Sequence, residues 1–168
     1  MNHLIEAVRR SVQEKNWYAA LTGALALPDI AGKLDGLSGG SEARYVAWFD
    51  RYLTPTYTTI VGGSQHVFLC GNDCYALRCA FLHLGDFDLM GQTARRVLTR
   101  FEFVEPPARR LHLNHSDNLV PGVSSLQVQI SFFCEEICMG VEKWLAARAT
   151  DPTVSAALAK LPVINFNP

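Results

Sequence analysis

Apolar positions in the first third of the chain recur at the spacing of amphipathic helices. A first helix is predicted over residues 2–15 and a second from Trp17 to about Asp35, with Asn16 as the cap of the second. Pro28 lies inside the second segment and is expected to kink or break it, because proline lacks a backbone N–H and disfavours helix at the preceding residue. The buried face of the first helix is predicted to contain Leu4, Ile5, Val8 and Val12.

A third helix is predicted from Ser41, as its cap, through Leu53. It carries an aromatic stripe at helical spacing, which indicates core packing. The stripe is made of Tyr45, Trp48, Phe49 and Tyr52. Residues 54–65 are polar and turn-like, and Pro55 with Gly62-Gly63 argues against a regular element there.

A fourth helix begins at a cap provided by Asn72 or Asp73 and ends at Gly85, a residue suited to a helix C-terminus. A further short helix is expected over residues 89–100, where it would carry Arg95 and Arg96.

The periodicity then changes to the alternation of strands. Residues 101–103 and 111–113, separated by a Pro-Pro pair, are expected to form a hairpin, and residues 126–130 a third strand. Ser131 can cap a last long helix to about Arg148, followed by a short helix and an extended end. The predicted fold is a single domain over residues 1–168, mainly α, with a small β-hairpin insertion around residues 101–130.

The predicted buried face of the last long helix contains Phe133, Ile137, Val141, Trp144 and Leu145.

Composition agrees with a compact globular protein: of 168 residues, 49% are hydrophobic and 18% are charged. The net charge of −1 provides no overall attraction to nucleic acid or to an anionic membrane. Eleven of the fifteen basic residues are arginine, however. Clusters of arginine can form local phosphate-binding patches, although the simpler interpretation is that they lie on solvated faces. The arginine pairs are Arg9-Arg10, Arg95-Arg96 and Arg109-Arg110.

The five cysteines are an odd number, and the first residues lack the basic-then-apolar order of a secretory signal. Reduced thiols and a cytoplasmic location are therefore expected. No apolar run reaches the roughly 18 residues that a membrane span needs. The expected cofactor set is empty.

The fourth helix stands out when its residues are projected at about 100° each. Its core stripe contains Cys74, Leu77, Phe81 and Leu84. The opposite side, which would be polar on an ordinary surface helix, carries Tyr75, Cys79 and Leu82. A helix that is apolar on two faces is buried on both, and a second copy of the chain is the simplest cover. The projection therefore predicts a homodimer.

Arg78 and His83 flank this second face. Five residues apart on a straight helix, they lie about 140° apart and are not expected to meet within one chain. Across a two-fold axis each Arg78 could approach the His83 of the other copy. An imidazole beside a guanidinium suits phosphodiester cleavage, with histidine as the acid or base and arginine holding the phosphate charge.

The sequence from Arg78 to His83, Arg-Cys-Ala-Phe-Leu-His, resembles the Arg-x4–6-His motif of the HEPN superfamily of helical ribonuclease domains. The resemblance implies a HEPN-like helical bundle and a metal-independent RNA endonuclease in which the 2′-hydroxyl of the RNA attacks the adjacent phosphate. It also implies RNA and a cognate antitoxin or defence-system component as partners. Arg78 and His83 would be catalytic, and Asn72, Tyr75 and Cys79 would line the substrate cleft.

Two departures from the family pattern are visible. Cys79 stands where the family usually has a polar residue, and the strand-forming segment is additional to the minimal helical core. The alternative function is a non-catalytic HEPN-like binding or structural protein that dimerises through the same helix. The structural alternative is that the spacing of the two residues is a coincidence: Arg78 pairs with a carboxylate such as Asp73 or Asp86, and His83 caps the helix end.

Other chemistries compete with this interpretation. The pairs Cys70/Cys74 and Cys134/Cys138 could together bind zinc, although their apolar surroundings favour core thiols and the preferred prediction has no metal. A second candidate metal site is formed by His112, His115 and Asp117. A thiolate–imidazolium pair of Cys79 and His83, one helical turn apart, is the remaining option.

Overall fold

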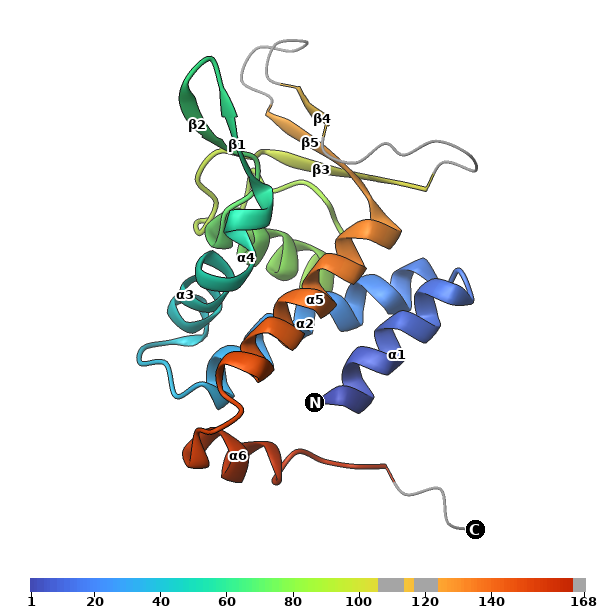
Figure 1. Ribbon diagram of the computed structural model, residues 1–168. Helices are drawn as coiled ribbons and strands as arrows, with labels where there is room; N and C mark the ends of the chain where they lie inside the picture. The colour runs from blue at the N-terminus through green and yellow to red at the C-terminus, as the bar shows by residue number, and fades with distance from the viewer. Residues whose placement is uncertain (106–113, 117–123, 165–168) are drawn as a thin grey trace.

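The structure is a computed structural model that describes residues 1–105, 114–116 and 124–164. It is mainly helical, with a small strand component at one end (Figure 1). The helices are α1 (Asn2–Gln13), α2 (Trp17–Leu34), α3 (Ser41–Tyr52), η1 (Thr54–Tyr57), α4 (Gly71–Cys79), η2 (Ala80–Leu84), α5 (Ile130–Ala147) and α6 (Pro152–Leu158). The strands are β1 (Thr58–Val61), β2 (Ser64–Val67), β3 (Arg100–Val104), β4 (Asn114–Ser116) and β5 (Ser125–Gln129).

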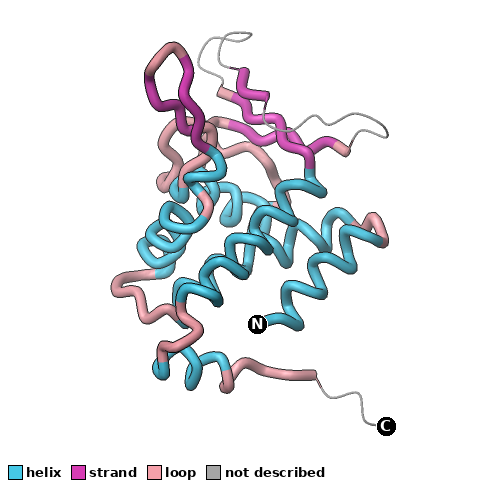
Figure 2. Tube along the Cα trace, viewed as in Figure 1, coloured by secondary structure: helices cyan, strands magenta, loops and turns pink. Residues whose placement is uncertain are grey.

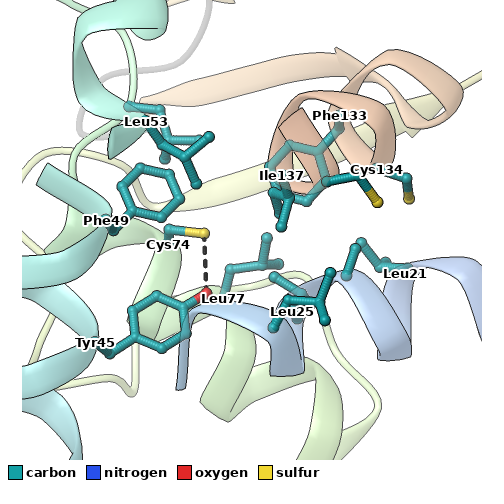
Figure 3. Close-up of a cluster of buried hydrophobic side chains, with 14 of the residues drawn as sticks. Leu21, Leu25, Tyr45, Phe49, Leu53, Cys74, Leu77, Phe133, Cys134 and Ile137 are labelled. Carbon is teal, nitrogen blue, oxygen red and sulfur yellow. Dashed lines mark hydrogen bonds between the residues drawn. The ribbon is translucent and has the colours of Figure 1, made fainter. Parts of the chain in front are cut away.

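The core forms where α2 packs against α1, α3 and α5, and α4 packs against α3. Figure 3 shows side chains from α2, α3, α4 and α5 meeting in one cluster. The predicted stripe on α3 points inward: Tyr45, Trp48 and Phe49 are fully buried. On α5 the predicted buried face is confirmed, although Leu145 is only partly buried. The helical periodicity therefore identified the surfaces that form the core.

Helix α2 is continuous through Pro28, which contradicts the expected break. Proline removes one backbone hydrogen bond, but Leu27 and Pro28 are both buried and the helix is packed on three sides. Tertiary packing thus outweighs the local penalty. The predicted cap is confirmed, because the Asn16 side chain accepts a hydrogen bond from the Ala19 N–H.

Three other predicted caps are wrong for a common reason. In each case the predicted residue makes a contact with a segment distant in sequence. Ser41 donates its hydroxyl to the Asp29 carboxylate at 2.9 Å. Asp73 accepts backbone N–H groups from the loop before β3, and Ser131 donates its backbone N–H to Glu105 at 3.0 Å. The N-cap residues are instead Gly40, Cys70 and Gln129.

Residues 58–67 form the β1–β2 hairpin, contrary to the prediction of an irregular segment (Figure 2). The two glycines that argued against regular structure provide its turn: Gly62 and Gly63 have φ values of 57° and 82°. Two consecutive residues with positive φ match the twist of antiparallel strands, and glycine adopts that conformation without strain.

The second sheet has the strand order β3-β5-β4. β5 is therefore the central strand, parallel to β3 and antiparallel to β4, and among the described strands β3 does not pair with β4, the next one along the chain. The expected hairpin of residues 101–103 with 111–113 stays a prediction. A parallel pair needs a long crossover connection, which the segment between β3 and β5 is long enough to provide. Leu111 and Leu113, assigned to the predicted second strand, lie outside the described residues.

The expected helix over residues 89–100 is also wrong. Its ends pair as extended chain, because Leu89 donates its N–H to the Thr99 carbonyl and Phe101 donates to Phe87. The segment between them is an ordered loop held by Asp73. The short last helix α6 is confirmed, and the described residues after it are non-helical through Ile164. Among the described helices, none combines the length and apolar character needed to cross a membrane.

Candidate active site

The central helix changes its winding between Arg78 and His83. α4 continues into η2, a π-helical turn that ends at Gly85 with φ 69°. In a π turn the backbone bonds join residues five apart, so residues at that spacing face the same side. Arg78 Nη1 consequently lies 3.3 Å from His83 Nε2 within one chain. The prediction that these two residues cannot meet without a second copy is wrong.

The same turn alters the predicted core stripe. Cys74 and Leu77 are fully buried as expected, but Leu84 is 71% exposed. The wider turn leaves Leu84 short of the rotation that a straight α-helix would give it, so it points away from the core. Phe81 is half-buried and stacks on Phe87, which lies just beyond the turn, with ring centroids 5.4 Å apart.

Arg78 is held from its other side by Asp29 of α2. Its Nη2 donates to Asp29 Oδ2 at 3.0 Å, and Asp29 Oδ1 accepts the Ser41 hydroxyl. The carboxylate thus connects α2, α3 and α4 at the site. Asp73 and Asp86, the partners expected under the structural alternative, bind backbone N–H groups instead.

The surroundings keep the Arg78 guanidinium charged. Burial by itself lowers its pKa, but the contacts with Cys79, Asp29 and Tyr75 outweigh burial and raise the pKa above its ordinary value. The Tyr75 ring lies 5.9 Å from the guanidinium carbon. Burial, followed by the contact with Cys79, raises the pKa of Tyr75 as well. Arg78 Nε is buried and has no hydrogen-bond partner among the described residues.

Cys79 and Tyr75 therefore belong to the same cluster as Arg78 and His83, as predicted. Cys79 Sγ lies 3.9 Å from Arg78 Nη1. Asn72 does not join them: it lies in the first turn of α4, where its backbone N–H faces the Cys70 thiol. The structure brings together four of the five predicted site residues.

Asp29 and Ser41 were not identified from the sequence. A signal for Asp29 was present, since it is the only acidic residue in the mostly apolar α2 and follows the proline directly. A lone carboxylate on such a helix needs a partner when it is half-buried. Ser41 looked like an ordinary cap, and nothing local distinguishes the two roles.

Part of the second apolar face of α4 is covered within the chain. Tyr75 packs its edge against Tyr45 of α3, with ring centroids 5.4 Å apart. Cys79 and Leu82 are half-buried and His83 is exposed. The end of this face, from Cys79 to Leu84, is less covered within the chain, and its last two residues are exposed.

The zinc site predicted from the two cysteine pairs finds little support. Cys74, Cys134 and Cys138 are buried, and burial raises the pKa of each thiol to about 12. Zinc binds the thiolate, which such burial disfavours. Within the part of the chain that the structure describes, no cluster of three or more His, Cys, Asp or Glu could hold a metal. His112 and Asp117 lie outside the described residues.

No protein-family model, curated protein or solved structure matches the chain. What the site can do therefore follows from its own chemistry. An imidazole can act as an acid or a base, and a guanidinium beside it can hold an anion. Acid–base chemistry on an anionic group is what such a pair can perform.

Proposed function

We propose that the protein is a metal-independent RNA endonuclease of the HEPN type that acts as a homodimer. The observation that carries the proposal is the 3.3 Å contact between Arg78 Nη1 and His83 Nε2 at the exposed end of a helix. The spacing of the two residues agrees with the Arg-x4–6-His motif, and the mainly helical fold is compatible with a HEPN-like bundle.

The proposed reaction is an internal transfer at phosphorus. The 2′-oxygen of the RNA forms a bond to the adjacent phosphorus, and the bond to the 5′-oxygen of the next nucleotide breaks. An imidazole accepts the proton of the 2′-hydroxyl, and a second acid gives a proton to the leaving oxygen. The products are a 2′,3′-cyclic phosphate and a 5′-hydroxyl end. Arg78 stabilises the charge that accumulates on the phosphate oxygens.

Asp29 has a positioning role in this proposal. It binds Nη2 of Arg78, so that Nη1 is directed toward His83 and the exposed side. Tyr75 lies beside the guanidinium and Cys79 follows it, and both would line the cleft. Asn72 would contact the RNA only farther along α4.

The homodimer provides the second acid or base. One chain supplies a single His83, whereas the reaction moves two protons. A two-fold axis near the exposed end of the Cys79–Leu84 surface would place two His83 side chains around one phosphate. It would also cover Leu84, which is 71% exposed in the single chain. A cognate antitoxin or defence-system partner and a cytoplasmic location complete the proposal.

A non-catalytic HEPN-like binding or structural protein is the second candidate. The ion pair between Arg78 and Asp29 favours it, because that pair links three helices and would be useful without any substrate. In this candidate the Cys79–Leu84 surface serves only for assembly.

Purified protein incubated with an RNA mixture, with and without EDTA, tests the proposal. We expect cleavage that survives EDTA, ends in 2′,3′-cyclic phosphates and is lost in His83→Ala and in Arg78→Lys. Lysine keeps the charge but not the forked geometry. His3→Ala, which removes another exposed histidine, is the matched control and should cleave normally.

Cleavage that both site variants retain would show that the proposed site is not the catalytic one. Absence of cleavage by a dimeric wild-type protein would favour the non-catalytic candidate. Light scattering at micromolar concentration measures the oligomeric state, and a monomer would contradict the homodimer.

A further inference from the structure

The arginine pair Arg95-Arg96 lies in an ordered loop that the proposed catalytic chemistry does not use. The loop borders a shallow pocket of about 330 Å³. Its lining consists of Met90, Gly91, Gln92, Thr93, Arg95 and Arg96, so the polar groups are two guanidinium ions, an amide and a hydroxyl. No carboxylate lines this pocket, and neither arginine forms an ion pair with any other described residue.

The loop has a defined shape although it is neither helix nor strand. Leu89 and Leu98 are buried at its two ends, and Ala94 packs partly against the core. Gln92 donates its backbone N–H to the Leu89 carbonyl at 2.8 Å. A turn anchored at both ends and in the middle has a defined backbone, from which its polar side chains extend.

Asp73 is the main support of this loop. Its side chain is 2% exposed, and Oδ1 accepts the backbone N–H of Arg96 at 2.7 Å and that of Val97 at 3.1 Å. A buried carboxylate is unfavourable unless donors surround it. Because its oxygens bind backbone N–H groups, the carboxylate shapes the loop without pairing with either guanidinium.

We infer that the Arg95-Arg96 pocket binds a backbone phosphate of the RNA substrate, away from the phosphate that is cleaved. The inference depends on the proposed function for the identity of the ligand. Arginine forks donate in pairs to phosphate oxygens, and Thr93 and Gln92 add neutral donors. Hydrogen bonds of this kind position a nucleic acid without reading its bases.

The position of the pocket suits an extended single strand. Asp73, which supports the loop, lies in the first turn of α4, and His83 lies ten residues farther along the same helical segment. Ten residues of helix span about 15 Å, a few nucleotides of single-stranded backbone. The loop is the yellow-green segment beside α4 in Figure 1. The proposed ligand is a single strand long enough to reach both places.

Fluorescence anisotropy with a labelled single-stranded 2′-O-methyl oligonucleotide tests the inference. This probe has the charged backbone but no free 2′-hydroxyl, so binding is measured without cleavage. We expect Arg95→Gln and Arg96→Gln each to weaken binding about fivefold at low salt. Each should also reduce the slope of log K against log salt by about 0.7.

Arg10→Gln is the matched control, because Arg10 is an exposed arginine of another Arg-Arg pair, on α1. It should leave both the affinity and the slope unchanged. Inorganic phosphate is the competitor that distinguishes a free anion from a nucleic-acid backbone, and it should displace the probe only at far higher concentration.

The inference is overturned if both loop variants bind the probe as tightly as the wild type and with the same slope, or if inorganic phosphate competes at the concentration of the oligonucleotide. Wild-type binding that both loop variants lose, in a protein that cleaves no RNA, would support the phosphate site and contradict the nuclease. RNA cleavage by the wild type, together with unchanged probe binding in the loop variants, would support the nuclease and contradict the phosphate site.

Discussion

Replacing Asp29 with asparagine tests whether a carboxylate from α2 holds the arginine of the site. The substitution keeps the shape and an oxygen that can accept the Ser41 hydroxyl bond, but it removes the charge opposite Arg78. Removing one partner of a fully buried ion pair costs about 3–5 kcal/mol. Here the Arg78 and Asp29 side chains remain 20% and 23% exposed, so water can partly solvate the arginine that is left. We therefore expect the free energy of unfolding to fall by about 2 kcal/mol, closer to the value of one charged hydrogen bond.

Urea denaturation of four proteins measures this effect: the wild type, Asp29→Asn, Arg78→Met and the double variant. The double-mutant cycle isolates the pairwise interaction, which we expect to be about 1–2 kcal/mol. Ser41→Ala is the comparison, because it removes only the neutral bond to the same carboxylate and should cost about 1 kcal/mol. RNA cleavage should decrease in Asp29→Asn, since Nη1 of Arg78 is no longer directed toward His83.

An interaction energy near zero would refute the reasoning, because Asp29 and Arg78 would then contribute independently. A stable Asp29→Asn variant with full cleavage would show that Arg78 needs no positioning from α2.

Three further predictions concern the turn, the thiols and pH. Gly85→Ala should reduce the free energy of unfolding by about 1 kcal/mol or more, because an alanine at φ 69° is strained where the π turn ends. It should also reduce cleavage. Gly91→Ala, at an open position without positive φ, is the control and should leave the free energy of unfolding unchanged in the same urea assay. Iodoacetamide should label Cys79 of the native protein well before the three buried thiols, because burial shields those thiols and raises their pKa. Mass spectrometry measures the labelling rates, and equal rates would contradict the burial of the three thiols. The buried thiols are Cys74, Cys134 and Cys138. Hydrogen bonds from Arg9 hold the pKa of Glu142 below its ordinary value, so this pair should stabilise the fold at neutral pH and lose that contribution as pH falls through the lowered pKa. Arg9→Gln should make unfolding only slightly less dependent on acid pH in urea denaturation, because the pair is well exposed.

The helices of the core were predictable because their signals are local. The apolar spacing on α1, α3 and α5 follows from helical geometry alone, and their predicted faces are buried. The end of the central helix at Gly85 was equally local, since only glycine adopts that backbone conformation easily. Glycine is misinterpreted in the β1–β2 hairpin when only the sequence is considered. Gly62 and Gly63 argue against regular structure there, but they form the turn between the two strands.

The candidate site was predictable in its residues but not in its geometry. Arg78 and His83 stand out in the sequence, yet a projection of a straight helix separates them by about 140°. The π turn brings them together, and a local pattern does not distinguish one extra residue per turn from an ordinary helix.

Sequence by itself determined most of the helices, including α1, α2, α3 and α5, and most of the faces that they bury, although it also predicted a helix over residues 89–100 that does not form. It also identified Arg78 and His83 as the pair at the end of the central helix. Only the tertiary structure decided what holds them. Asp29 reaches Arg78 from 49 residues away, Asp73 shapes a loop 23 residues ahead, and β3 pairs with β5 instead of with its next neighbour. These are contacts between polar groups that are distant in sequence, and each of them depends on packing that brings the elements together first. Local periodicity reflects burial, and it carries no information about which distant partner will satisfy a buried charge.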